Sequence, residues 1–121
     1  MRPKYLNLFR IRMPVTAVVS IAHRISGFLL VLCIPVFLFS LQASLENAQS
    51  YNSLLQYISK PITQCFLVLI IWAIVHHLVA GIRFLLIDID IGVSKTIARG
   101  SAWSVHIIAI VFTLYIAWRM V

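Results

Sequence analysis

Two adjacent histidines, His76 and His77, lie within a long apolar stretch, where polar side chains are costly and are therefore functional candidates. Neighbouring residues of a helix point about 100° apart, so only one of the two can face a given partner. His77 is followed at i+3 and i+4 by Ala80 and Gly81, which leave its face with little bulk. His76 instead shares a face with Arg83 at i+7. A neutral imidazole beside open space can ligate haem iron, as in b-type cytochromes. A histidine that hydrogen-bonds between packed helices is an equally good interpretation of His77 and the preferred one for His76.

A second imidazole would be needed for ligation of iron from both sides, and the chain offers His23 and His106. His23 is expected at the cytoplasmic end of the first apolar helix, whereas His77 lies about 16 Å from the end of the second. This difference in depth argues against His23 as the opposite ligand. His106 remains a candidate within the chain. In a homo-oligomeric b cytochrome, His77 would pair with His106 or with His77 of another copy. Another subunit is the preferred source of the second ligand.

A second polar group shares one face of the first apolar helix. Its members are spaced i, i+3, i+4 and i+7, and they are Ser20, His23, Arg24 and Gly27. Near the membrane surface, Ser20 could donate a hydrogen bond to a carbonyl and Arg24 could stabilise developing negative charge. A lipid-soluble molecule with a carbonyl head, such as a quinone, suits this niche. In the alternative interpretation the stripe is interfacial, and Arg24 extends to phosphate head groups.

Three uncharged windows must position these residues: 25–45, 61–82 and 100–118, with 21, 22 and 19 residues of the 121-residue chain. About 20 apolar residues cross the hydrocarbon layer as a helix. Only 11% of the residues are charged, against about 25% in soluble domains. We therefore predict a single all-α transmembrane domain over 1–121, an integral membrane bundle with helices at about 15–44, 62–88 and 101–120. Apolar residues at helical spacing between 46 and 60 also predict a short helix at the outer interface, with a polar loop as the alternative.

The charges indicate how the helices are oriented. Ten Lys and Arg accompany three Asp and Glu, and seven of the ten lie before the first window or between the second and third predicted helices: Arg2, Lys4, Arg10, Arg12, Arg24, Lys95 and Arg99. The positive-inside rule therefore predicts a cytoplasmic N-terminus. This orientation also accounts for the excess of basic over acidic residues, so nucleic acid is not expected as a partner.

Other classes of protein are not supported by the sequence. The basic leader and the long first window do not fit a cleaved signal peptide. Cys33 and Cys65 fall within predicted spans and lack the spacing of a disulfide or zinc framework. We find no glycine-rich phosphate loop and no paired catalytic carboxylates, so soluble hydrolytic or nucleotide chemistry is not expected.

Two motifs together resemble a known family. They are Ser20-Ile21-Ala22-His23-Arg24-Ile25-Ser26-Gly27, which follows Arg2-Pro3, and His77-Leu78-Val79-Ala80-Gly81-Ile82-Arg83-Phe84 with Asp88. This pattern is similar to the larger membrane-anchor subunit of succinate dehydrogenase, the cytochrome b subunit of respiratory complex II (succinate:quinone oxidoreductase). The likeness covers the whole chain in length, three-span layout and motif placement.

The resemblance implies roles for individual residues. His77 would be the axial ligand of a haem b shared with the small anchor subunit, which would supply the opposite ligand. Ser20 and Arg24 would help to form the ubiquinone site, and His23 and Arg24 would lie near the haem propionates, where positive charge offsets two carboxylates. The chain departs from common relatives at Phe84, where a second histidine often follows the Gly-x-Arg. Arg83 or a neighbouring subunit would then serve as that propionate partner.

The resemblance also implies that the chain is not an enzyme by itself but a non-flavin membrane subunit in electron transport and the tricarboxylic acid cycle. Succinate would be oxidised at flavin in a soluble subunit, and electrons would pass through iron-sulfur clusters to ubiquinone at the membrane face. The expected partners are the flavoprotein, the iron-sulfur subunit and the small anchor, in a bacterial inner membrane that this chain crosses several times. A fumarate reductase anchor is one alternative. The other is a channel, transporter or assembly subunit without haem, in which His76, His77 and Arg83 line a proton or ion path.

Overall fold

The computed structural model describes residues 13–120, and all regular structure within this range is helical. Three helices are long and apolar enough to cross a membrane: α1 (Val15–Glu46), α3 (Pro61–Asp88) and α4 (Lys95–Met120). A short helix, α2 (Ala48–Ile58), connects α1 to α3. The predicted all-α fold with three candidate spans is confirmed. The basic residues Arg2, Lys4, Arg10 and Arg12, which contribute to the predicted orientation, lie outside the described residues.

Local sequence explains where the helices begin and end. Pro14 has an extended backbone, with ψ at 151°, immediately before α1, and Pro61 occupies the first turn of α3, where its missing N–H costs nothing. Asn47 ends α1 and caps α2, because its side-chain oxygen accepts a hydrogen bond from the Ser50 amide at 2.8 Å. The predicted short helix between 46 and 60 is thus confirmed as α2.

The third span differs from the prediction at its start, because α4 begins at Lys95 rather than at about 101. An uncharged window marks the part of a helix that fits in hydrocarbon, whereas a helix can continue into the polar interface. The turn between α3 and α4 is formed by residues with positive φ, Asp90 at 62° and Gly92 at 79°. Glycine adopts such a conformation at little cost, which suits Gly92 to this tight connection.

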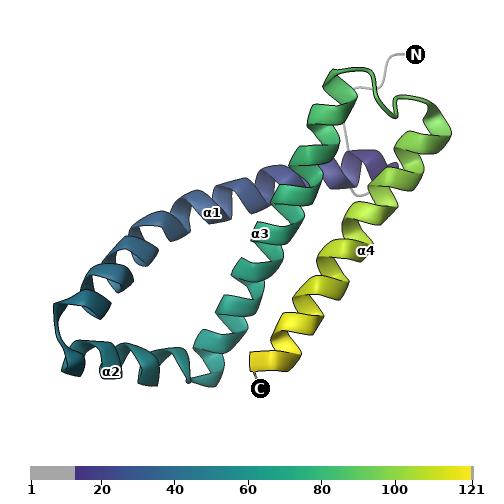
Figure 1. Ribbon diagram of the computed structural model, residues 1–121. Coiled ribbons are helices and arrows are strands. Elements are labelled where there is room, and N and C mark those ends of the chain that lie inside the picture. Colours follow the sequence, from purple (N-terminus) through teal and green to yellow (C-terminus); the bar gives the residue numbers. More distant parts are fainter. Residues whose placement is uncertain (1–12, 121) are drawn as a thin grey trace, which may run out of the picture.

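The helices pack through small side chains. In Figure 1, α3 and α4 run side by side in opposite directions, whereas α1 crosses α3 through its N-terminal half and then diverges toward α2. Small residues let helix backbones approach closely inside a membrane. The fully buried apolar side chains are accordingly small or medium in size: Val19, Ala73, Ala80, Ala102, Val105 and Ala109.

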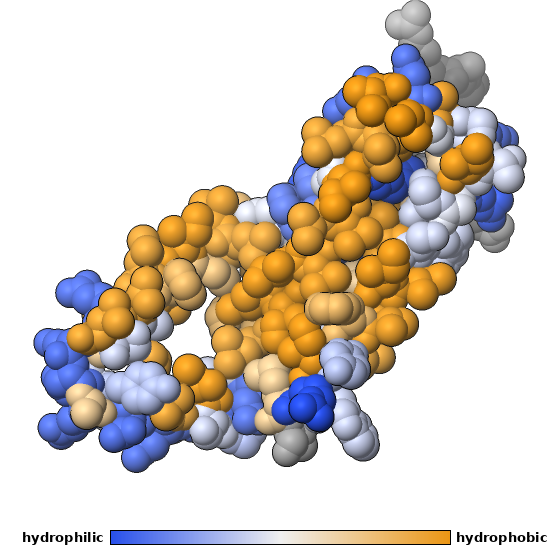
Figure 2. Space-filling view, viewed as in Figure 1, coloured by the Kyte–Doolittle hydropathy of each residue, from blue (hydrophilic) through white to orange (hydrophobic). Residues whose placement is uncertain are grey.

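The surface has the distribution expected of a membrane protein. Figure 2 shows apolar side chains over the middle of the long helices and hydrophilic ones near α2 and near the α3–α4 turn. The same view shows an opening between the C-terminal half of α1, α2 and α3. α1 is curved along this part, which contains Pro35. In a bilayer the part of this opening between α1 and α3 must be occupied by lipid or by another polypeptide, since apolar side chains line it there.

Candidate functional site

The crossing of α1 and α3 holds His77 by its Nδ1 atom. This nitrogen lies 3.2 Å from the carbonyl oxygen of His23 and 3.3 Å from the Ser26 hydroxyl oxygen. The Ser26 hydroxyl itself donates to the His23 carbonyl at 2.8 Å. A carbonyl oxygen can only accept a hydrogen bond, so the proton of the His77 ring belongs on Nδ1. The lone pair is then on Nε2, the tautomer that a histidine needs to ligate a metal through that atom.

Gly27 creates the space for this ring. A Cβ atom at Gly27 would lie 2.9 Å from Cε1 of His77 and 3.2 Å from Nδ1, closer than carbon atoms pack. The sequence pattern attributed the open space beside His77 to Ala80 and Gly81. In the structure, however, Ala80 packs into the buried cluster with Val105 of α4, and Gly81 gives room to His23, whose Nε2 would be 3.5 Å from an added Cβ. The glycine that opens the space is therefore on the opposite helix.

His23 lies against the same ring. The ring centroids of His23 and His77 are 4.1 Å apart and the two ring planes are inclined by only 9°. The ring of Phe84 packs against His23 in a T-shaped arrangement, with the centroids 5.3 Å apart. The predicted difference in depth between His23 and His77 is thus wrong. α1 already starts at Val15, so His23 lies about 12 Å along the helix, and α1 crosses α3 obliquely. His23 is still unsuited to be the opposite ligand, because rings stacked face to face do not direct nitrogens at one iron between them.

Ser20 and Arg24 lie on α1, three residues before His23 and one residue after it. Ser20 is half-buried and Arg24 is exposed, and neither side chain forms a hydrogen bond or ion pair with any other residue between 13 and 120. Their spacing of one helical turn is as predicted, since both belong to α1.

His76 points to the other side of α3, as the angle between adjacent helical residues predicts. Its side chain is fully buried, and its ring centroid lies 5.2 Å from that of His106 on α4 and 5.2 Å from that of Trp72. Within the described residues, Nδ1 and Nε2 of His76 and Nε2 of His106 have no hydrogen-bond partner. The ring of His106 thus packs against that of His76. The structure does not bring His106 to His77 as an intrachain ligand.

Arg83 also faces α4. Its Nε atom donates to the Ser101 hydroxyl at 2.9 Å and its Nη2 atom donates to the Ala98 carbonyl at 3.0 Å, with 7% of the residue exposed. The guanidinium carbon lies 5.4 Å from the centroid of the Phe84 ring. Arg83 therefore ties α3 to the first turns of α4, whereas His77 contacts α1.

Comparison with known proteins identifies the family. The family model of the succinate dehydrogenase/fumarate reductase transmembrane subunit matches residues 1–117. The chain belongs to this family. The resemblance drawn from the two motifs is thereby confirmed, and so is the role of a membrane subunit of succinate dehydrogenase that differs from the catalytic flavoprotein.

A relative within this family is similar along nearly its whole length. The succinate dehydrogenase cytochrome b556 subunit of Coxiella burnetii (strain RSA 493 / Nine Mile phase I) is 34% identical over 114 residues, which cover 91% of this chain and 89% of the relative.

Proposed function

We propose that this chain is the haem b-binding membrane anchor of a succinate dehydrogenase and that His77 is its axial ligand. The observation that carries the proposal is the fixed tautomer of His77: the His23 carbonyl and the Ser26 hydroxyl engage Nδ1, and Nε2 has no hydrogen bond within the described residues. An outer hydrogen bond of this kind orients a ligating imidazole and raises its basicity. The name of the Coxiella relative, a cytochrome b556 subunit, supports a haem of the same type.

The opposite ligand would come from the small anchor subunit. The chain has four histidines, and none of the other three lies where it could ligate the same iron from the side opposite His77. His23 stacks on His77, and His76 pairs with His106 on the far side of α3. Bound haem would supply one-electron redox chemistry, while the protein sets its position and electronic properties.

Three polar side chains of α1 and α3 are the candidates to hold the propionate groups of such a haem: His23, Arg24 and Arg83. His23 contacts His77 directly, and Arg24 follows it on α1. Arg83 is the third candidate, because its two hydrogen bonds to α4 use only two of the five guanidinium N–H groups. Phe84 contacts both Arg83 and His23, and the resemblance implies a histidine at its position, so Arg83 is the substitute that we propose from α3.

Ser20 and Arg24 would form this chain's part of the ubiquinone site. The Ser20 hydroxyl would donate a hydrogen bond to a quinone carbonyl, and Arg24 would stabilise the negative charge that develops on reduction. We place this end of α1 at the cytoplasmic face of a bacterial inner membrane. The start of α1 and the basic residues Lys95 and Arg99 of α4 line one cavity, so the described positive charge gathers at this end. Protons for quinone reduction would reach the site from water without crossing lipid.

Purification through a tag on this chain tests the proposal. We expect a flavoprotein, an iron-sulfur protein and a second small membrane protein to copurify, with haem b and succinate:ubiquinone reductase activity. Ser20→Ala and Arg24→Leu should lower ubiquinone reduction about 10- to 100-fold and leave succinate oxidation by a soluble artificial acceptor largely intact. Ser40→Ala and Arg119→Leu, the same changes at the other ends of α1 and α4, should affect neither activity.

Other outcomes would contradict parts of the proposal. A purified complex without haem or flavoprotein would favour the proton- or ion-pathway subunit. Faster fumarate reduction than succinate oxidation with the native quinone would identify a fumarate reductase anchor. Equal loss of both activities in the Ser20 and Arg24 variants would indicate failed assembly rather than a quinone site.

A further inference from the structure

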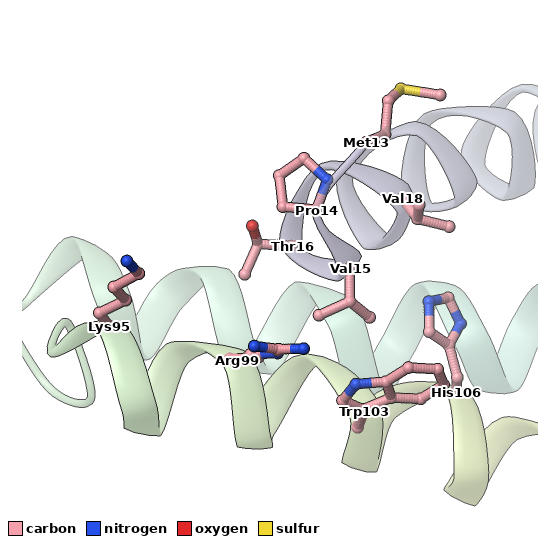
Figure 3. Close-up of a pocket in the computed structure, with 9 residues that line it drawn as sticks. All are labelled: Met13, Pro14, Val15, Thr16, Val18, Lys95, Arg99, Trp103 and His106. Carbon is pink, nitrogen blue, oxygen red and sulfur yellow. The ribbon is translucent and has the colours of Figure 1, made fainter. Parts of the chain in front are cut away.

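A cavity of about 690 Å³ opens between the start of α1 and the first three turns of α4. Figure 3 shows Lys95, Arg99 and Trp103 in a row along α4, on the side that faces the beginning of α1. Their spacing of four residues places them in one stripe. The cavity is separate from the contacts of His77, and neither Ser20 nor Arg24 lines it.

Two cationic side chains, Lys95 and Arg99, line this cavity, and no acidic side chain of the described residues lines it. No ion pair joins Lys95 or Arg99 to an acidic side chain within residues 13–120. The three acidic residues of the whole sequence are Glu46, Asp88 and Asp90, so residues 1–12 also contain none. An anion from outside the chain would therefore be attracted to both charges, since Arg and Lys form strong charge-assisted hydrogen bonds with phosphate.

Below the two cations the wall is apolar. Val15 and Val18 of α1 and the indole of Trp103 line this part. Tryptophan typically occupies the level of lipid head groups, where one edge of the ring is polar and the other is apolar. A ligand that fills the cavity must then combine a negative head with an apolar body. A free phosphate ion would bind the two cations but would leave the apolar wall in contact with water.

We infer that this cavity binds the head group and upper acyl chains of an anionic phospholipid. Its phosphate lies between Lys95 and Arg99, and its acyl chains follow Val15, Val18 and Trp103 into the bilayer. A zwitterionic lipid binds less well, because its own ammonium group is repelled by the two cations. The cavity volume is within the range of about 300–1,000 Å³ typical of ligand sites and exceeds what a phosphate ion alone would fill.

The test uses the complex recovered through a tag on this chain, exchanged into phosphatidylcholine nanodiscs with a small fraction of phosphatidylglycerol. Mass spectrometry counts the phosphatidylglycerol retained by each complex. We expect Lys95→Gln and Arg99→Gln each to weaken retention about fivefold and the double variant about 25-fold. Arg119→Gln, which removes one charge at the opposite end of α4, should retain the lipid, as should the charge-conserving Arg99→Lys.

Two results would overturn the inference. One is unchanged phosphatidylglycerol retention in the double variant. The other is displacement of the bound lipid by millimolar inorganic phosphate alone, which would identify a phosphate site. If the double variant does not assemble, the wild-type complex decides: phosphatidylglycerol should raise its thermal midpoint progressively and phosphatidylcholine should not, and equal effects of the two lipids would refute a selective site.

Discussion

The α1–α3 crossing and the α3–α4 interface each contain two histidines within the membrane-spanning helices, and they treat the ring nitrogens differently. At the crossing, Nδ1 of His77 has two oxygen neighbours, and Gly27 leaves the ring its space. At the interface, the His76 ring is fully buried and neither nitrogen has a partner among the described residues. Position in an apolar helix therefore does not distinguish the proposed ligand, His77, from His76. What distinguishes His77 is a backbone carbonyl that fixes its tautomer and a glycine that leaves space for its ring.

The two regions also differ in what holds the helices together. Polar groups at the crossing converge on one imidazole, whereas at the interface they join helix to helix, because Arg83 donates to Ser101 and to Ala98. We accordingly expect changes at the crossing to alter haem binding and equivalent changes at the interface to alter stability.

The largest contrast is expected for glycine-to-alanine changes. Gly27→Ala forces a Cβ to within 2.9 Å of the His77 ring and should displace it, weakening haem binding by about 1–3 kcal/mol. Gly81→Ala, with a contact at 3.5 Å, should have little effect, and Gly100→Ala on α4, where the added Cβ meets nothing within 4 Å, should have none. Haem per complex, measured as the pyridine haemochrome, checks the series. Equal haem in all three variants would show that the crossing does not position the ligand.

A smaller contrast is expected for serine-to-alanine changes. Ser26→Ala removes one of the two oxygens near Nδ1 and leaves the His23 carbonyl, so haem affinity should fall about tenfold, the lower end for outer-shell partners. Ser101→Ala removes the acceptor of Arg83 and should lower stability by about 1–3 kcal/mol while haem is retained. Haem titration and thermal unfolding of both variants separate the two effects. A loss of haem in Ser101→Ala without a loss in Ser26→Ala would reverse the comparison.

Much of the fold could be predicted because it depends on local sequence. Uncharged windows mark the three spans, Pro61 marks the start of α3, and the helical angle separates the faces of His76 and His77. The uncharged window does not predict the start of α4, because the first turns contain Lys95 and Arg99 and a helix does not end where the hydrocarbon ends.

The detailed geometry of the site depends on how the helices cross, which periodicity does not specify. The sequence places Gly27 on the same face as His23, but only the crossing of α1 over α3 brings that glycine against His77. The same oblique crossing sets His23 level with His77, contrary to depths counted along separate upright helices. The pairing of His76 with His106 likewise depends on the register of α3 against α4.

Reduced-minus-oxidised absorption spectra of complexes that carry His77→Ala or His76→Ala test the central claim most directly, since the two changes are chemically identical and adjacent in the chain. The account predicts that the haem b band is abolished or changed to that of a five-coordinate haem in His77→Ala and is unchanged in His76→Ala. A normal band in His77→Ala, with or without its loss in His76→Ala, would contradict the assignment of His77 as the ligand.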